Sequence, residues 1–135
     1  MKGYVDLFLL PVPKRNLSKY RRLAQRFGEI IRDHGALEYR EWLGDDLHVK
    51  GMVAFPSKIK LKPGEVLISS AVEFRSKSHR NQVNKAMMND LRTKRLMEEK
   101  PVFDMKRMLY GGFSTIVKMK DAKGSKTPTT KRKKK

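Results

Sequence analysis

The hydrophobic and polar positions of the chain first alternate with the period of a strand. The segment Tyr4–Pro13 is apolar on both alternating faces apart from Asp6, which is typical of a central strand. Pro11 and Pro13 place its end because proline donates no hydrogen bond to a ladder. The segment 65–75 has the same two-sided pattern. These segments are predicted to be the interior strands of one sheet.

A helical period follows the first strand. Residues at spacings of three and four predict one apolar stripe, formed by Leu17, Tyr20, Ala24, Phe27, Ile31 and His34. Asn16 is the expected N-cap of this helix. Gly35 is expected to end it because glycine readily takes the left-handed conformation.

A second helix is predicted from a serine cap, Ser76 or Ser78, to about Asp90. Its inward side is expected to hold Val83, Ala86, Met87 and Leu91. The segment that follows, residues 91–104, is charged and irregular and predicts no more than one further helical turn before Pro101.

Two further strands complete the pattern. Residues 36–43 alternate, with Leu37, Tyr39, Glu41 and Leu43 on one face and Glu38, Arg40 and Trp42 on the other. Residues 107–118 form the last strand, in which Gly111-Gly112 indicates a bulge or a close approach of a backbone or ligand. Residues 44–64 exceed the usual length of a structureless loop, so a short strand or a docked arm is expected there.

The order of these elements, βαββαβ, predicts an α+β fold of the ferredoxin-like type, with a four-stranded antiparallel sheet and two helices on one face. Helices on one side cannot cover strands that are apolar on both faces. The other face is therefore expected to pack against the same face of an identical subunit, which predicts a homodimer.

Charge separates the chain into a body and a tail. The net charge is +18, of which residues 118–135 carry +8 and the remainder +10. We predict one domain at residues 1–119 and a disordered Lys-rich tail at 120–135, which has too few apolar residues to form a core. So basic a chain attracts polyanions in general, without sequence recognition.

Composition excludes several classes of site. The chain has no cysteine, which removes disulfides, thiolate nucleophiles and Cys-based metal sites and suits a reducing compartment. Its longest early apolar run, Val5–Val12, is too short to span a bilayer and lacks a cleavage pattern. We therefore expect a cytoplasmic protein without a transmembrane segment, and no metal or cofactor.

Several unusual strings occur in an order that resembles the small bacterial YbaA-like family of unknown function. They are Tyr4–Asp6 with Leu10–Pro13, His34–Glu41, Gly44–Asp46, Phe55-Pro56, Ser78–Arg80 with Asn84, Phe103-Asp104 with Lys106–Met108, and Tyr110–Phe113. The match runs from about residue 3 to residue 117. The resemblance implies the dimeric α/β-barrel superfamily and its face-to-face dimer. That superfamily also includes cofactor-free monooxygenases of antibiotic biosynthesis, so it implies no single activity.

Three residues are candidates for catalysis. His34 ends the first helix on its apolar stripe and is a candidate general base or metal ligand, with Glu38, Glu41 or Glu73 as expected neighbours. The structural alternative is a histidine that favours the C-terminal helix dipole and packs on the sheet. His48 and His79 lack ligand spacing and are expected in a loop and at a helix cap.

Carboxylates and aromatic residues within strands are candidates for a ligand pocket. Asp6 and Glu73 interrupt apolar strands, where a carboxylate is costly unless paired, and Arg40 or Arg75 is the expected partner. The alternatives are a structural ion pair at the dimer face and a pocket carboxylate of raised pKa. The candidate ligand-binding residues are Asp6, Tyr39, Trp42 and Tyr110, although strand aromatics are also ordinary core or dimer contacts.

The predicted function is the binding or transformation of a small organic molecule in a pocket between sheet and helices. The alternative is a non-enzymatic protein that binds nucleic acid weakly and without sequence specificity. Its candidate contacts are Arg15, Lys19, Arg22 and Arg26 on one helix face and Lys131, Arg132 and Lys133 in the tail. A solvated helix face and a merely solubilising tail are the structural alternatives.

Overall fold

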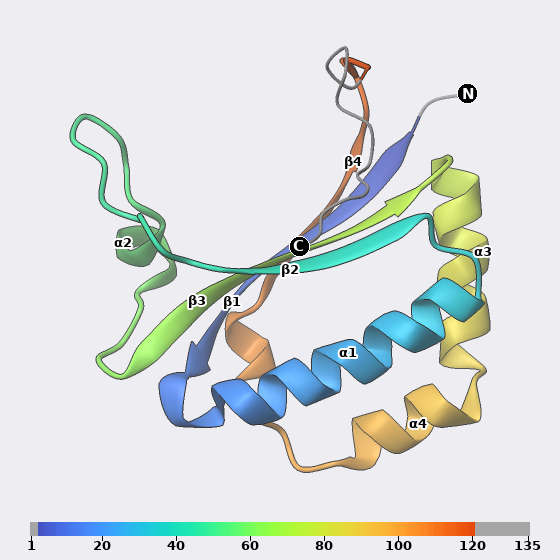
Figure 1. The fold of residues 1–135 in the computed structure, drawn as a ribbon, viewed down its shortest axis with the longest axis horizontal. Coiled ribbons are helices and arrows are strands. Elements are labelled where there is room, and N and C mark those ends of the chain that lie inside the picture. The colour runs from blue at the N-terminus through green and yellow to red at the C-terminus, as the bar shows by residue number, and fades with distance from the viewer. Residues whose placement is uncertain (1–2, 121–135) are drawn as a thin grey trace, which may run out of the picture.

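The computed structural model describes residues 3–120, which form a four-stranded antiparallel sheet with helices on one face (Figure 1). The strands, in the spatial order β2-β3-β1-β4, are β1 Tyr4–Pro13, β2 Glu38–Leu43, β3 Glu65–Phe74 and β4 Leu109–Ser114. The helices are α1 Leu17–Asp33, α2 Phe55–Ile59, α3 Lys77–Met88 and α4 Leu91–Glu98, with 3-10 turns at Lys14–Asn16 and Met105–Arg107. This topology confirms the predicted ferredoxin-like α+β fold.

The two strands predicted to be interior, β1 and β3, lie at the centre of the sheet. They pair along their whole length, from Tyr4 opposite Phe74 to Pro13 opposite Glu65. Because side chains alternate across a strand, this register directs the even-numbered residues of both strands towards α1, α3 and α4. The odd-numbered residues form the other surface of the sheet, called here the open face.

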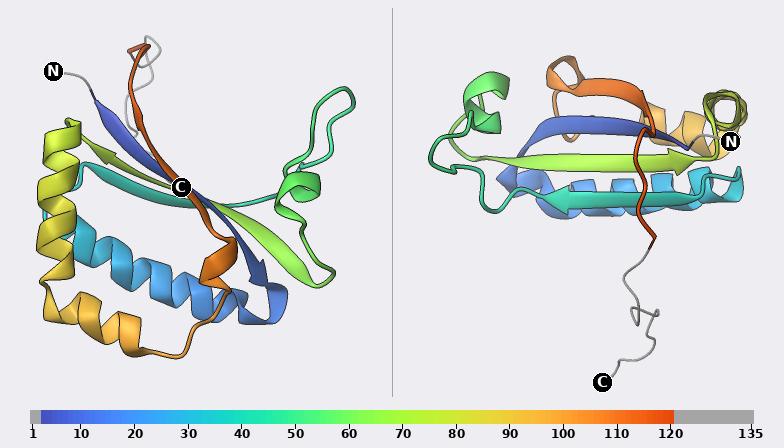
Figure 2. Two further views of the ribbon diagram at one scale, coloured as in Figure 1. Left: turned by 180° about the vertical axis from the view of Figure 1, so that it is seen from behind. Right: turned by 90° about the horizontal axis from the view of Figure 1, so that it is seen from above.

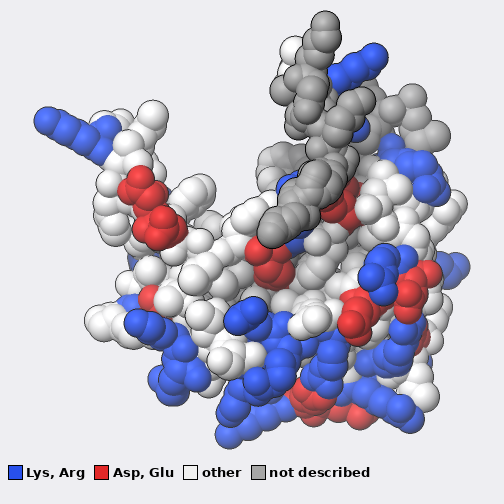
Figure 3. All heavy atoms as spheres, in the orientation of Figure 1, with Lys and Arg blue, Asp and Glu red and all other residues white. Residues whose placement is uncertain are grey.

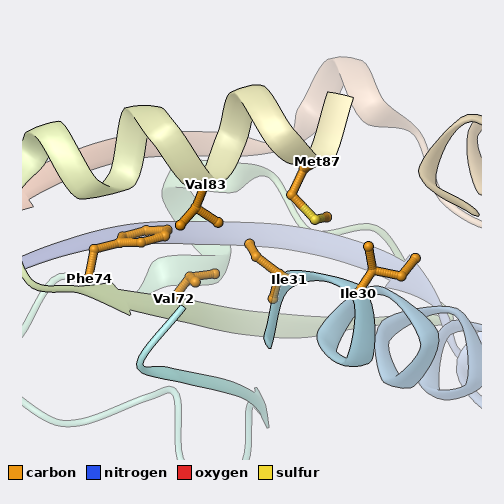
Figure 4. Close-up of a cluster of buried hydrophobic side chains, with 6 residues drawn as sticks. All are labelled: Ile30, Ile31, Val72, Phe74, Val83 and Met87. Atoms are coloured by element: carbon orange, nitrogen blue, oxygen red, sulfur yellow. The ribbon is translucent and has the colours of Figure 1, made fainter. Parts of the chain in front are cut away.

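The helix face of the sheet carries the hydrophobic core. One cluster contains Ile30, Ile31, Val72, Phe74, Val83 and Met87 (Figure 4). A second cluster contains Leu10, Val12, Tyr20, Ala24 and Ile68. The α1 stripe predicted from the sequence therefore packs inward. The predicted inward position of Leu91 is wrong, because Leu91 begins α4 and is 58% exposed.

Helix ends agree with the predictions in part. Gly35 follows α1 with a φ of 105°, a conformation that glycine adopts without steric cost. Ser76 caps α3 by accepting a hydrogen bond from the backbone N–H of His79. Asn16 stands at the N-cap of α1 without capping it, since its side chain donates to the carbonyl oxygen of Val102. The segment after α3 forms the eight-residue helix α4, capped by Asp90, and is thus more helical than predicted.

The glycine pair in β4 permits a close approach. The register of β4 with β1 runs without a break from Leu109 to Ser114, so the predicted bulge is absent. A Cβ atom on Gly112 would meet the ring of Tyr4 at 2.8 Å. The close approach at Gly112 is thus made by the Tyr4 side chain and not by the predicted backbone or ligand, and a Cβ atom there would require the ring to shift.

Residues 44–64 form an arm beyond the end of the sheet. It contains the short helix α2 instead of the predicted strand. The views in Figure 2 place the arm away from α1, α3 and α4, towards the side of the open face. Its exposed apolar side chains are Val49, Met52, Val53 and Phe55. Residues 121–135 lie outside the described residues, so the disordered tail stays a prediction.

A buried ion pair ties α3 to the central strand. Asp6 is 2% exposed, and the Arg80 guanidinium donates to its carboxylate at 2.8 Å. The predicted partners, Arg40 and Arg75, are wrong. Arg40 lies opposite Ala71 in the sheet and so projects from the open face, whereas Asp6 belongs to the helix face. Arg80 comes from α3, which covers that face.

The Arg80→Met substitution is expected to destabilise the protein by about 3 kcal/mol, because it leaves the buried Asp6 carboxylate without its cation. The double substitution Asp6→Leu with Arg80→Met is expected to recover most of that loss, since it removes both buried charges. Urea unfolding of the three proteins measures the difference. Equal stability of wild type and Arg80→Met would contradict a charge-pairing role for Arg80.

Candidate functional site

A groove opens between α1 on one side and α4 with the segment 99–108 on the other. Its floor is the helix face of the sheet, where Phe8, Leu10, Glu41 and Ser70 line it. Its walls are mainly apolar and consist of Tyr20, Leu23, Ala24, Phe27, Tyr39, Met87, Met88, Leu96, Met97, Val102, Phe103, Met105 and Met108. Concave, mostly apolar surfaces with a few convergent polar groups are the usual form of small-molecule sites.

Glu41 is the polar centre of this groove. Tyr20 donates to one carboxylate oxygen at 2.7 Å, and Ser70 donates to the other at 3.1 Å. Tyr39 also donates to the second oxygen. The pairing of β2 with β3 sets Glu41 directly opposite Ser70, and α1 brings Tyr20 down onto them. Three hydroxyl groups from three elements thus converge on one carboxyl group.

The electrostatic setting of Glu41 differs from that of the other partly buried acids. Burial raises the pKa of Glu41, and the hydrogen bonds from Tyr39, Tyr20 and Ser70 oppose that rise. Within residues 3–120, no Lys, Arg or His side chain forms an ion pair with this carboxylate. Asp6 and Glu65, by contrast, are each paired with an arginine. Glu41 is therefore stabilised by neutral donors alone.

The other proposed catalytic residues lie elsewhere. His34 caps the C-terminal end of α1, and its Nε2 lies 2.7 Å from a carboxylate oxygen of Asp90. It follows Tyr20 by fourteen residues, so about 21 Å of helix separates it from the turn of α1 that contacts Glu41. Glu73 is exposed on the open face. The structure does not bring His34, Glu41 and Glu73 together.

The candidate ligand-binding residues divide among three places. Tyr39 belongs to the Glu41 cluster. Tyr110 accepts a hydrogen bond from Arg80 at 2.6 Å and joins the Asp6 network, where burial raises the pKa of Asp6 and Arg80 opposes the rise. Trp42 lies on the open face with the Arg40 guanidinium 5.2 Å from its ring.

Two members of the cluster were missed in the sequence. The sequence pattern predicts Tyr20 only as a member of the apolar helix stripe, and Ser70 only as a member of an almost apolar strand face. The signal available was that Ser70 and Glu41 each place a polar side chain in the middle of a strand face that is otherwise apolar. Such positions on neighbouring strands are able to meet, but strand pairing and register decide whether they do.

The proposed basic contacts lie along one side of the groove, on α1 and on the 3-10 turn that precedes it. Arg15, Lys19, Arg22 and Arg26 all line the groove and are exposed. The tail candidates Lys131, Arg132 and Lys133 lie outside the described residues. Among residues 3–120, no group of three or more His, Asp or Glu side chains is placed to hold a metal ion. No helix of that range is long and apolar enough to cross a membrane.

Comparison with known proteins supports both the family and the fold. Residues 3–105 match the model of a family described as a protein of unknown function (DUF1428). The uncharacterized protein YbaA of Escherichia coli K12 and that of Shigella flexneri are each 35% identical over 114 residues, which cover 84% of this chain and 97% of the relative. A crystal structure of a dimeric ferredoxin-like protein from an uncultured marine organism aligns with a TM-score of 0.50 and 8% identity, over 89% of this chain and 99% of that one. The chain belongs to the YbaA-like family of proteins of unknown function (DUF1428).

Proposed function

We propose that the protein binds a small organic molecule in the groove and acts on it through the Glu41 carboxyl group. The observation that carries this proposal is the cluster in which Tyr20, Tyr39 and Ser70 all donate to Glu41. Hydroxyl donors orient a carboxylate without neutralising it by an opposite charge. Glu41 thus keeps its capacity to accept a proton from a molecule in the groove.

The reaction class that this arrangement supports is proton transfer. A general base works best when its pKa lies near the working pH, and burial shifts the pKa of Glu41 upward in that direction. Burial and the nearby Glu41 charge also raise the pKa values of Tyr20 and Tyr39, so both remain neutral donors. When Glu41 takes a proton, one of the hydroxyl groups is able to rotate from donor to acceptor. The cluster therefore accommodates both protonation states.

The Glu41 carboxyl is expected to titrate above the ordinary range of a glutamate, because burial disfavours its charged form. Carbon NMR of the side-chain carboxyl measures the midpoint, and Glu41→Gln assigns the signal by its loss. Tyr20→Phe is expected to raise the midpoint further, since it removes a hydrogen bond to the carboxylate. A midpoint at or below the ordinary value would exclude the proposed base. Linkage gives a second readout: stability falls as pH rises through this titration, and Glu41→Gln lacks that component.

Binding in the groove is testable with the neutral fluorescent probe phenylnaphthylamine. Saturable binding of one probe per chain is expected, because the groove has apolar, aromatic walls. Leu23→Trp fills part of the groove and should weaken binding at least about tenfold, or about 1.4 kcal/mol. Leu37→Trp is the matched control, since Leu37 is exposed and does not line the groove. If wild type does not bind the probe, or if both variants lose affinity for it equally, the groove is not the binding site.

We further propose that the open face packs against the same face of a second copy. It exposes four large side chains on three of the four strands: Leu7 on β1, Trp42 on β2, and Leu109 and Phe113 on β4. The arm adds further exposed apolar side chains beside it. Contiguous apolar patches of this kind are usually covered in solution. The structural neighbour described as a dimeric ferredoxin-like protein offers support for such an assembly.

A dimer at micromolar concentration is the expected result of sedimentation equilibrium for wild type. Leu109→Lys should give a monomer, because two like charges would be buried at a symmetric interface. Leu91→Lys is the matched control: Leu91 is 58% exposed and Leu109 54%, but Leu91 lies on α4, on the other side of the sheet. A monomeric wild type, or dissociation by both substitutions alike, would refute this interface.

A further inference from the structure

The mouth of the groove is strongly basic. Its basic side chains, all exposed, are Arg15, Lys19, Arg22, Arg26 and Lys100, against two exposed acids, Glu29 and Glu99. Arg26 is paired with Glu99 at 2.7 Å. The other four bases form no ion pair within residues 3–120. Figure 3 shows the Lys and Arg side chains gathered over the surface formed by α1. A ligand entering the groove passes a surface of positive potential.

The wall of the groove contains a polar atom without a partner. Thr93 on α4 is 6% exposed and lines the groove, and its hydroxyl oxygen is the buried side-chain polar atom within residues 3–120 that makes no hydrogen bond. A buried polar atom without a hydrogen-bond partner costs free energy, which a bound partner would recover. Thr93 is therefore suited to pair with an oxygen or nitrogen atom of a bound molecule.

We propose that the ligand of the groove is an amphipathic organic anion. Its apolar, ring-sized body lies among Phe27, Met87 and Phe103, and its carboxylate or other anionic group lies at the basic mouth. A second polar atom on the body pairs with Thr93. This inference rests on the proposed function and adds the chemical class of the molecule.

The arrangement of the bases favours a small anion over nucleic acid. Glu29 follows the basic stripe on α1 and Glu99 is paired with Arg26, so a phosphate backbone lying along the whole of α1 would meet both acids. The bases instead border the apolar interior of the groove, which offers no favourable contact to the charged phosphates of a nucleic acid. A molecule that is charged at one end and apolar at the other meets both surfaces at once. The stripe predicted to bind polyanions is thus assigned to the mouth of the small-molecule site.

The test compares phenylnaphthylamine with anilinonaphthalene sulfonate, which has the same rings and one added sulfonate group. Wild type is expected to bind the sulfonate at least about tenfold more tightly at about 150 mM salt. Replacing Arg15, Lys19 and Arg22 together by glutamine should remove that gain, so that the variant binds the two probes alike. The matched control replaces Lys50, Lys58 and Lys62 by glutamine. It removes the same charge from exposed side chains of the arm, outside the groove, and should retain the gain.

The outcomes separate this inference from the proposed function. If neither probe binds, the proposed groove function fails. If both bind equally, or the two triple variants lose the gain alike, the groove function stands and the anionic ligand class is overturned. If an RNA oligonucleotide displaces the sulfonate probe at the same salt concentration, the basic stripe binds nucleic acid. That result would also overturn the anionic ligand class.

The role of Thr93 is measured with naphthoate and its isomeric hydroxynaphthoates. At least one hydroxylated isomer is expected to bind wild type about threefold or more tightly than naphthoate, a gain of the size of one modest hydrogen bond. Thr93→Val keeps the shape of the side chain without its hydroxyl, and it should abolish that gain, measured as the ratio of the hydroxynaphthoate and naphthoate affinities in the same protein. Loss of the gain confirms the contact. No gain with any isomer, or the same gain in Thr93→Val, would overturn it.

Discussion

The antiparallel pairing of β1 with β3 is the constraint on which the rest of the structure depends. It is continuous from Tyr4 opposite Phe74 to Pro13 opposite Glu65, and it settles which side chains face the helices. With this register, β2 adds to β3 so that Glu41 lies beside Ser70 under α1. A shift of β2 by one residue would move Glu41 to the open face and its neighbours in sequence to the groove. The same strand pairing therefore positions both the hydrophobic core and the candidate site.

The protein stabilises its partly buried acids in two different ways. Asp6 and Glu65 receive arginine side chains from distant segments, Arg80 and Arg107, in contacts that hold α3 and the 3-10 turn at Met105–Arg107 to the sheet. Glu41 receives only hydroxyl groups and lines the groove. An arginine neutralises an acid and joins two elements, which suits a structural contact. Neutral donors preserve a titratable group, which suits chemistry.

Particular elements show how far the sequence predicts this protein. The stripe of α1 and the two-sided strands 4–13 and 65–75 have strong periods, and the structure confirms them with shifts of at most one residue at their ends. The charges of the segment 91–98 obscure a weak apolar period, so the sequence predicts an irregular segment there. In the structure this segment forms α4, which packs against α1. The partner of Asp6 was sought in neighbouring strands, whereas Arg80 reaches it from α3 above the sheet.

The sequence by itself determined the order of the elements, the two-faced apolar strands and the density of positive charge, because these follow from periodicity and composition along the chain. It also placed Glu41 and Tyr39 on one strand face and the four bases on one helix face. Only the tertiary structure decided that Tyr20 and Ser70 join Glu41, that His34 stays apart from it, and that the bases border the same groove. Contacts between residues distant in the chain depend on strand register and helix placement, which no local pattern specifies.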